Sequence, residues 1–298
     1  NETIVTGRIS KLYQISKYEL LMTVRALNEN KKLLVSIHPM YARIQLTQLN
    51  YPTPDFPNAL TMFLRKHIEG SFIERIEQVG LDRILKITLR GRNEFKDLVE
   101  YHLYIEIMGK HSNFILTNKE DKILECLKRV SPSDSIRIMQ PGITYSYPPL
   151  LDKKNPFKNT PETTNLVKEF EGFSKDLAEE VSSRMEQGED FKSIMNEIRN
   201  SEELYITRGD KEKYHVIPLN CFGKKIDKYS LFEGLDAYYQ FIDQKDRIKQ
   251  QTSDILHFIQ KEYTKNVNKL DKLEKTLFDS HNSDEYRIKG DLLYASLH

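Results

Sequence analysis

The pattern of hydrophobic and polar positions divides the sequence into two parts. In the first 150 residues, apolar or alternating runs rich in Ile, Val and Leu are separated by polar breaks, which is typical of short β-strands. These runs lie at 3–13, 19–26, 33–38, 43–47, 73–79, 84–89, 101–108, 114–117 and 123–130. So many short strands do not suit a parallel βαβ array. We therefore predict an α+β protein whose N-terminal domain is a β-sandwich or partly closed barrel with one or two helices.

One helix interrupts these strands. We predict that Asp55 caps it, that Pro57 lies in its first turn and that Gly70 ends it. The apolar positions follow helical spacing at Leu60, Phe63, Leu64 and Ile68. Arg65 and Lys66 therefore fall on or near the opposite, polar face of this helix.

The second part begins after a Pro-rich stretch at 141–156, which reads as a linker. A helical pattern at 160–199 is broken at 170–174, around Gly172. A Gly-centred turn between short helices is the outline of a helix-hairpin-helix unit, whose turn amides can hold a phosphate. An ordinary helical hairpin fits the same pattern and is favoured by the pattern alone. Two short strands are predicted next, at 204–207 and 214–219.

From Gly234 onward the pattern is helical. Apolar residues recur at a spacing of three to four, with charges of both signs between them, which predicts the start of an antiparallel coiled coil. We predict a turn at 281–283 and a returning helix from 286. The apolar positions include Ile248, Ile255, Ile259, Val267, Leu270, Leu273 and Leu277.

Length and charge limit the possible functions. The 298 residues suggest about two domains, and 45 Lys+Arg against 44 Asp+Glu leave a net charge of +1. A nucleic-acid surface therefore requires local segregation of charge. No apolar run approaches the length of a membrane span. The chain begins without Met and ends inside a helical pattern, so we expect a fragment of a longer protein.

Motifs for catalysis or metal binding are missing from the sequence. There is no Gly-rich phosphate loop, no zinc-protease motif and no hydrolase serine motif, so we expect neither an enzyme nor a cofactor. Cys126 and Cys221 cannot build a disulfide framework or a four-ligand zinc site, which fits a reducing cytoplasm. The tripeptide Arg208-Gly209-Asp210 matches an integrin-binding signal, but turn chemistry between two strands explains it better.

Two stretches carry unusual residues. Glu106 and Met108 end a predicted strand, and spacing alone favours a solvated Glu and a core Met over a displayed surface. Asp82 and Arg83 lie in a turn that enters the next strand. Strand alternation places Arg83 on the same face as the apolar row Leu85, Ile87 and Leu89, which we expect to face inward. An inward-facing arginine needs a carboxylate or a phosphate as partner.

These segments together resemble the NFACT family, whose bacterial members are the RqcH-type proteins, often named fibronectin-binding protein A. The resemblance spans nearly the whole chain. It is carried by GRISK at 7–11, LVSIHP at 34–39, LRKHIEG at 64–70, LDR at 81–83, IEIMGKHSN at 105–113, the hairpin around Gly172, and RIKQQ at 247–251.

The resemblance implies a fold and a function. It implies an N-terminal domain at 1–157 like that of formamidopyrimidine-DNA glycosylases, a helix-hairpin-helix region with a short β-hairpin at 158–238, and the start of a coiled-coil arm at 239–298. It implies binding to obstructed large ribosomal subunits that hold peptidyl-tRNA, and recruitment of alanyl-tRNA for untemplated C-terminal alanine tailing of the stalled chain. The family positions implicated in tRNA binding and tailing match Asp82, Arg83, Glu106, Ile107 and Met108.

The sequence departs from the family pattern in three places. The family's first helix and the distal half of the family's proteins are absent, and Lys175 stands where relatives often have Pro. Candidate phosphate contacts, expected to cluster on one surface, are Arg65, Lys66, Arg90, Arg92, Lys110 and Gly172.

Two other functions remain as alternatives. A surface adhesin that binds fibronectin or fibrinogen is suggested by the inherited name, with a minor cell-surface pool beside the cytoplasmic one. A glycosylase-like enzyme would need an N-terminal Pro-Glu nucleophile and a four-Cys zinc finger, and the sequence supplies neither. We favour the cytoplasmic, ribosome-associated function.

Overall fold

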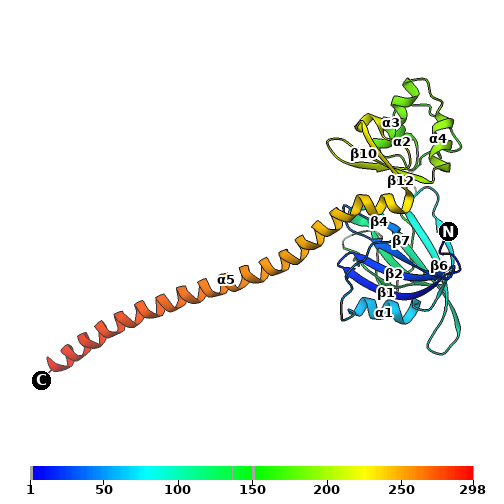
Figure 1. Cartoon of the computed structure of the whole chain (residues 1–298). Coiled ribbons are helices and arrows are strands. Elements are labelled where there is room, and N and C mark those ends of the chain that lie inside the picture. Colours follow the sequence, from blue (N-terminus) through cyan, green and yellow to red (C-terminus); the bar gives the residue numbers. More distant parts are fainter. Residues whose placement is uncertain (1–2, 134, 136, 150–151, 298) are drawn as a thin grey trace. The chain divides into compact units, whose positions relative to one another are not determined.

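The computed structural model describes residues 3–133, 135, 137–149 and 152–297, without the side chains of 250, 251, 254 and 282. The chain forms two compact units, Asn1–Tyr239 and Gln240–His298. Figure 1 shows the first unit as strands and short helices and the second as part of one long helix. Among the described residues, no helix is apolar enough over a sufficient length to cross a membrane.

A nine-stranded antiparallel sheet forms the first part of unit 1, in the order β4-β3-β2-β1-β5-β6-β7-β8-β9. The predicted strands are present, most of them with ends shifted by a few residues. The strands are β1 (Arg8–Ser16), β2 (Glu19–Ala26), β3 (Glu29–Ser36), β4 (Arg43–Thr47), β5 (Phe72–Gln78), β6 (Ile84–Arg92), β7 (Leu98–Glu106), β8 (Asn113–Asn118) and β9 (Ile123–Cys126).

This sheet curves around a common core. One apolar cluster takes Met22 from β2 together with Leu103 from β7 and Phe114 from β8. The two ends of the sheet also approach each other, because the Nζ of Lys128, just after β9, donates to the Ile37 carbonyl, just after β3, at 3.1 Å. No β4–β9 pairing closes the sheet within the described residues. The predicted α+β class is confirmed. Within it, a single sheet that bends over its own core replaces the two-sheet sandwich, and its ends approach without pairing, as the alternative of a partly closed barrel requires.

Helix α1 (Ala59–Ile68) packs Leu64 and Ile68 into this core, and Gly70 follows it with a φ of 89°. The predicted cap at Asp55 is wrong. Asn58 caps the helix instead, because its side-chain oxygen accepts the Thr61 amide at 2.9 Å.

The second part of unit 1 contains α2 (Leu166–Glu169), α3 (Lys175–Glu186) and α4 (Phe191–Asn200). The rings of Phe170, Phe173 and Phe191 pack together in their core. A small antiparallel sheet follows, in the order β11-β10-β12. Its strands are β10 (Glu203–Arg208), β11 (Lys213–His215) and β12 (Lys225–Ser230), of which the third was not predicted.

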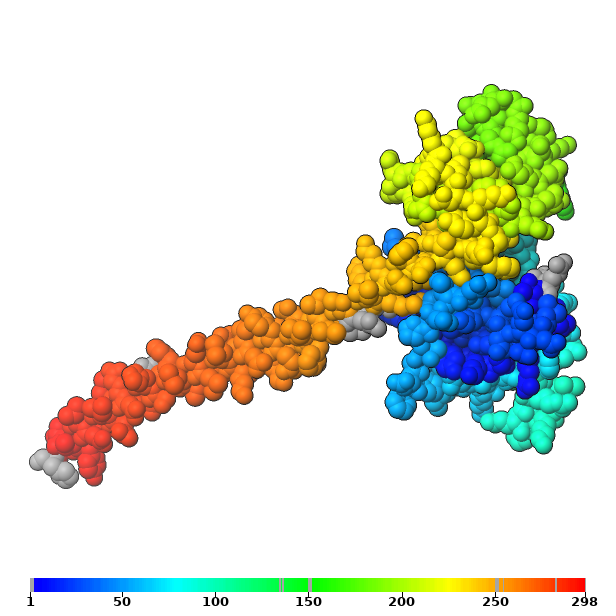
Figure 2. All heavy atoms as spheres, in the orientation of Figure 1, coloured from blue at the N-terminus to red at the C-terminus, as the bar shows by residue number. Residues whose placement is uncertain are grey.

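Helix α5 (Leu231–Ala295) is continuous over 65 residues. The predicted turn at 281–283 and the returning helix from 286 are therefore wrong. His, Asn and Ser lower helix propensity by only fractions of a kcal/mol each, which is too little to end a helix without Gly or Pro. In Figure 2 the orange to red part of α5 is a rod. Its apolar side chains, among them Ile255, Leu273 and Leu292, are exposed.

Candidate functional site

The pairing of β6 with β7 brings the two unusual stretches together. Ile84, the first residue of β6, lies opposite Glu106, the last residue of β7. Just beyond this pair, the Ile107 amide donates to the Arg83 carbonyl at 2.8 Å. Gly80 adopts a φ of 60° in the turn that precedes Arg83. A turn and a strand end about 25 positions apart in sequence are thus direct neighbours.

Asp82 and Arg83 are exposed on this turn. The Asp82 carboxylate accepts the Arg83 amide at 2.9 Å, and the Asp82 carbonyl accepts from the Gln78 side chain at 2.9 Å. The Arg83 side chain forms neither a hydrogen bond nor an ion pair in the part of the chain that the structure describes. The prediction that Arg83 faces inward is wrong. The strand alternation applies only within β6, where Ile87 and Leu89 are buried, and Arg83 precedes that strand.

Glu106 lies inside the protein, with an exposed fraction of 1%. Both of its oxygens accept from the Arg137 guanidinium, and one also accepts the Tyr145 hydroxyl at 2.8 Å. Arg137 Nε donates to the Ser146 carbonyl at 2.6 Å, and the Tyr145 ring stacks on Tyr104 at 3.9 Å. Burial lowers the Arg137 pKa, but hydrogen bonds to Glu106 and its charge outweigh this, so the pKa is raised. Glu106 is therefore neither solvated nor displayed.

The two residues after Glu106 form the edge of the site. Ile107 and Met108 are half-buried, and Met108 packs against the apolar cluster below. The Met108 amide donates to the buried Ser112 hydroxyl at 2.8 Å, and Gly109 turns the chain with a φ of 58°. Lys110 is exposed on this turn, two residues after Met108.

The turn around Gly172 adjoins the same place. Gly172 has a φ of 74°, and a Cβ built on it would lie 3.8 Å from the Leu81 carbonyl oxygen. Leu81 directly precedes Asp82. Residues from β5–β6, β7 and the α2–α3 connection therefore meet around the Asp82–Arg83 turn.

The other four candidate phosphate contacts lie elsewhere. Arg90 and Arg92 are at the opposite end of β6, and the seven residues from Arg83 to Arg90 span about 23 Å. Three of the four have acidic partners: Lys66 with Glu94 at 3.1 Å, Arg90 with Glu74 at 2.9 Å, and Arg65 with Glu69 at 3.6 Å. The expectation of one basic surface is wrong, because the strand places the two groups at its two ends.

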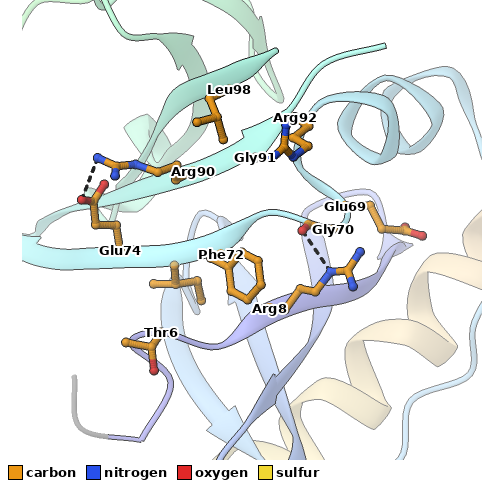
Figure 3. Close-up of a pocket in the computed structure, with 11 residues that line it drawn as sticks. Thr6, Arg8, Glu69, Gly70, Phe72, Glu74, Arg90, Gly91, Arg92 and Leu98 are labelled. Atoms are coloured by element: carbon orange, nitrogen blue, oxygen red, sulfur yellow. Dashed lines mark hydrogen bonds and ion pairs between the residues drawn. The ribbon is translucent and has the colours of Figure 1, made fainter. Parts of the chain in front are cut away.

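A cavity of about 690 Å³ lies at this second end. Figure 3 shows Arg8, Phe72, Arg90, Arg92 and other residues around it, with the dashed contacts of Arg8 to Gly70 and Arg90 to Glu74.

The comparisons with known proteins give one consistent family. The family model described as NFACT N-terminal and middle domains matches residues 1–298. The chain belongs to the NFACT family. It is 37% identical to the Rqc2 homolog RqcH of Bacillus subtilis over 322 residues, covering 100% of this chain and 56% of that protein. Human ribosome quality control complex subunit NEMF is 25% identical over 138 residues, covering 46% of this chain and 12% of that protein.

Solved structures agree with this assignment. The N-terminal part of the fibronectin/fibrinogen-binding protein from Streptococcus suis matches with a TM-score of 0.72 and 33% identity, covering 80% of this chain and 94% of that one. The fibrinogen binding protein from Staphylococcus aureus matches with a TM-score of 0.69 and 33% identity, over 79% and 93% of the two chains. The chain spans about half the length of the curated RqcH relatives it matches.

Sequence reasoning missed two residues of this candidate site. Arg137 and Tyr145 hold Glu106, yet they lie 31 and 39 positions away from it. Arg137 lies just before the predicted linker at 141–156 and Tyr145 lies within it, and no hydrophobic periodicity in this part of the sequence indicates a buried residue. An acidic residue at the end of an otherwise apolar strand was the one available signal, since a buried carboxylate requires a partner.

Proposed function

We propose that this NFACT chain acts in ribosome-associated quality control. In this proposal it binds obstructed large ribosomal subunits that hold peptidyl-tRNA and recruits alanyl-tRNA, so that alanines are added without a template to the stalled chain. It is a binding factor, because peptide transfer belongs to the ribosome. The support is the set of relatives named as Rqc2 homologs.

The exposed Arg83 side chain carries the proposal for the site. Because the Arg83 side chain has no hydrogen bond or ion pair among the described residues, it is available for a phosphate or a base edge. Its planar guanidinium can donate two parallel hydrogen bonds. Asp82 is occupied on one side by the Arg83 amide, which fixes the turn, and its carboxylate can accept from a ribose hydroxyl. We assign tRNA engagement to this pair.

Glu106, Ile107 and Met108 have different roles in the same proposal. Glu106 is a positioning residue, because its buried pair with Arg137 fixes the strand end that bonds to Arg83. The half-buried Ile107 and Met108 offer an apolar edge on which a nucleoside can pack. Lys110 and the turn amides around Gly172 are the phosphate contacts within reach of this turn.

The proposed function also implies a binding partner and a cellular location. The exposed apolar residues of α5 suit a helical partner segment, and we propose that the arm they belong to contacts the ribosome. This predicts a cytoplasmic, ribosome-associated protein. Removing residues 243–298 from the full-length protein should reduce its sedimentation with large subunits, and unchanged sedimentation would contradict the role of the arm.

The site is tested by changing the exposed pair. Asp82→Ala with Arg83→Ala in the full-length protein should abolish recruitment of alanyl-tRNA, measured by sequencing the RNA that co-purifies, and should abolish alanine tailing. A matched control is Lys119→Ala with Glu120→Ala, which also removes one exposed base and one exposed acid from neighbouring positions on a turn. Normal tailing by the first variant would refute the assignment.

An adhesin is the second candidate, favoured by the fibronectin and fibrinogen-binding names of the structural neighbours. The Arg208-Gly209-Asp210 tripeptide gives it little support, because Arg208 is engaged by Asp227 and Glu212. Fractionation separates the two functions: a ribosomal factor sediments with large subunits, whereas an adhesin stays with the cell wall.

A further inference from the structure

Strand register aligns arginines and a phenylalanine on one exposed face of the sheet. Arg25 of β2 lies opposite Arg8 of β1, Arg8 lies opposite Phe72 of β5, and Phe72 lies opposite Arg90 of β6. Residues directly opposite in a ladder project from the same face. Phe72 is 53% exposed although it is a large apolar side chain. Together with Arg92, these residues are called the arginine groove below.

The groove consists of two neighbouring hollows. The cavity of about 690 Å³ is lined by Arg8, Phe72, Arg90 and Arg92 (Figure 3), and a neighbouring hollow of about 520 Å³ shares Arg8 with it and adds Arg25. Between Arg90 and Arg92, a Cβ on Gly91 would lie 2.2 Å from the Ser71 Oγ. The absence of a side chain there lets β6 approach β5 closely while both arginines remain exposed.

Positive charge in the groove is neutralised only in part, because Arg8, Arg25 and Arg92 form no ion pair within the described residues. Glu74 is engaged by Arg90, and Glu69 by Arg65. Within the described residues, Arg8 and Arg92 donate only to backbone carbonyls, of Gly70 at 3.0 Å and of Lys96 at 2.7 Å.

Arg25 forms neither a hydrogen bond nor an ion pair in the described part of the chain, yet it faces Arg8 directly. Like charges placed directly opposite each other destabilise a sheet. The stability of the fold therefore does not explain why Arg8 and Arg25 lie opposite each other. A polyanionic ligand would explain it, because its charge would neutralise both.

We propose that the arginine groove binds a single-stranded segment of RNA, with Phe72 stacking on an unpaired base and Arg8, Arg25 and Arg92 contacting phosphates. An exposed aromatic ring inside a positively charged groove is the combination with which proteins bind single-stranded nucleic acids. An acidic peptide would satisfy the charges and leave Phe72 without a stacking partner. This inference rests on the proposed function in ribosome binding, and it concerns the end of β6 opposite to the Asp82–Arg83 turn.

The test measures binding of a fluorescent, unstructured RNA of about ten nucleotides to the 298-residue chain, at salt concentrations from about 50 to 200 mM. Arg25→Gln with Arg92→Gln should weaken binding and reduce the slope of log affinity against log salt by about 1.4, since each phosphate contact contributes about 0.7. Phe72→Ala should weaken binding by about 5- to 150-fold and leave that slope unchanged. The control Arg129→Gln with Arg287→Gln removes the same charge from exposed positions elsewhere.

Three results would overturn the proposal. They are equal losses in the control and groove variants, a Phe72→Ala variant that binds like wild type, and a poly-glutamate peptide that binds as tightly as RNA with the same dependence on Phe72. Thermal unfolding separates lost binding from lost structure, because Arg25→Gln relieves repulsion and should not lower the melting temperature. The Asp82–Arg83 assignment is measured with alanyl-tRNA, so either one can fail while the other stands.

Discussion

Two pairs of an acidic residue and an arginine lie at the same end of β6 and β7, and they differ in burial. Asp82 and Arg83 are exposed on a turn, and their side chains do not bond to each other. Glu106 and Arg137 are joined by two hydrogen bonds inside the protein. The Ile107 amide, bonded to the Arg83 carbonyl, links the two pairs directly.

The comparison shows that burial separates a structural role from a binding role. A buried carboxylate must be paired, because an unpaired charge in a low-dielectric interior is strongly unfavourable. Glu106 is therefore committed to Arg137 and cannot also bind a ligand. The exposed arginine is stabilised by water and can exchange that water for a phosphate. The four predictions that follow test this division, in order of expected effect on the free energy of unfolding.

The largest effect is expected from Arg137→Ala. Without the guanidinium, Glu106 keeps a buried charge, and among the described residues the Tyr145 hydroxyl is its one remaining side-chain donor. The free energy of unfolding at pH 7 should therefore fall by about 3–5 kcal/mol. Urea denaturation measures this. Combining Arg137→Met with Glu106→Leu removes both charges and should recover most of the loss. A small effect of Arg137→Ala would show that Glu106 reaches water.

A smaller effect is expected from Tyr145→Phe. It removes one hydrogen bond to a charged group and leaves the ring stacked on Tyr104, so the expected loss is about 1.5–2 kcal/mol. Tyr13→Phe is the control, because the Tyr13 hydroxyl has no hydrogen bond within the described residues, and it should change stability by less than about 0.5 kcal/mol. If both variants lost the same free energy of unfolding, the hydrogen bond from Tyr145 to Glu106 would not be the cause of the loss.

Asp121 offers an intermediate case that depends on pH. Burial raises its pKa, but hydrogen bonds from His102, at 2.6 Å, and from Tyr104, at 2.7 Å, lower it more, so the pKa lies below its usual 3.8. A lowered carboxyl pKa stabilises the folded state above the unfolded pKa, and this stability is lost as the pH falls through the folded pKa. The advantage of wild type over Asp121→Asn in melting temperature should therefore shrink between about pH 6 and pH 3.

Because the Asp121 side chain is partly exposed, solvent screening should keep this effect below that of Tyr145→Phe. The variant itself is well matched, since Asn tolerates the positive φ of 57° at this position as Asp does. An advantage that stays constant over this pH range would mean that the carboxylate charge is not involved.

The smallest effect on stability is expected from Asp82→Ala with Arg83→Ala. Both side chains are exposed on a turn and Arg83 has no partner among the described residues, so the free energy of unfolding should change by less than about 0.5 kcal/mol. The same variant should lose alanyl-tRNA recruitment. A melting temperature far below that of wild type would instead indicate a structural pair, and the contrast with Glu106 and Arg137 would disappear.

Much of the secondary structure could be predicted, because it depends on short-range patterns. Alternating apolar residues predicted β2 and β4 with the bounds they have in the structure. Errors arose where several residues could do the same task, as with Asp55 and Asn58 at the start of α1, or where weak propensity was taken as a break, as at 281–283 in α5. The helix-hairpin-helix unit, the coiled coil and the three-domain division remain predictions.

The sequence by itself determined the family, the strands and the identity of the residues around Asp82 and Glu106, since motifs and periodicity are local properties. Tertiary structure decided which of those residues is buried, because strand order and register bring Arg137 and Tyr145 to Glu106 and leave Arg83 in solvent. It also separated Arg90 and Arg92 from Arg83 by the length of one strand and placed Arg25 opposite Arg8. Contacts between distant positions depend on how sheets pair and bend, which no window of local sequence encodes.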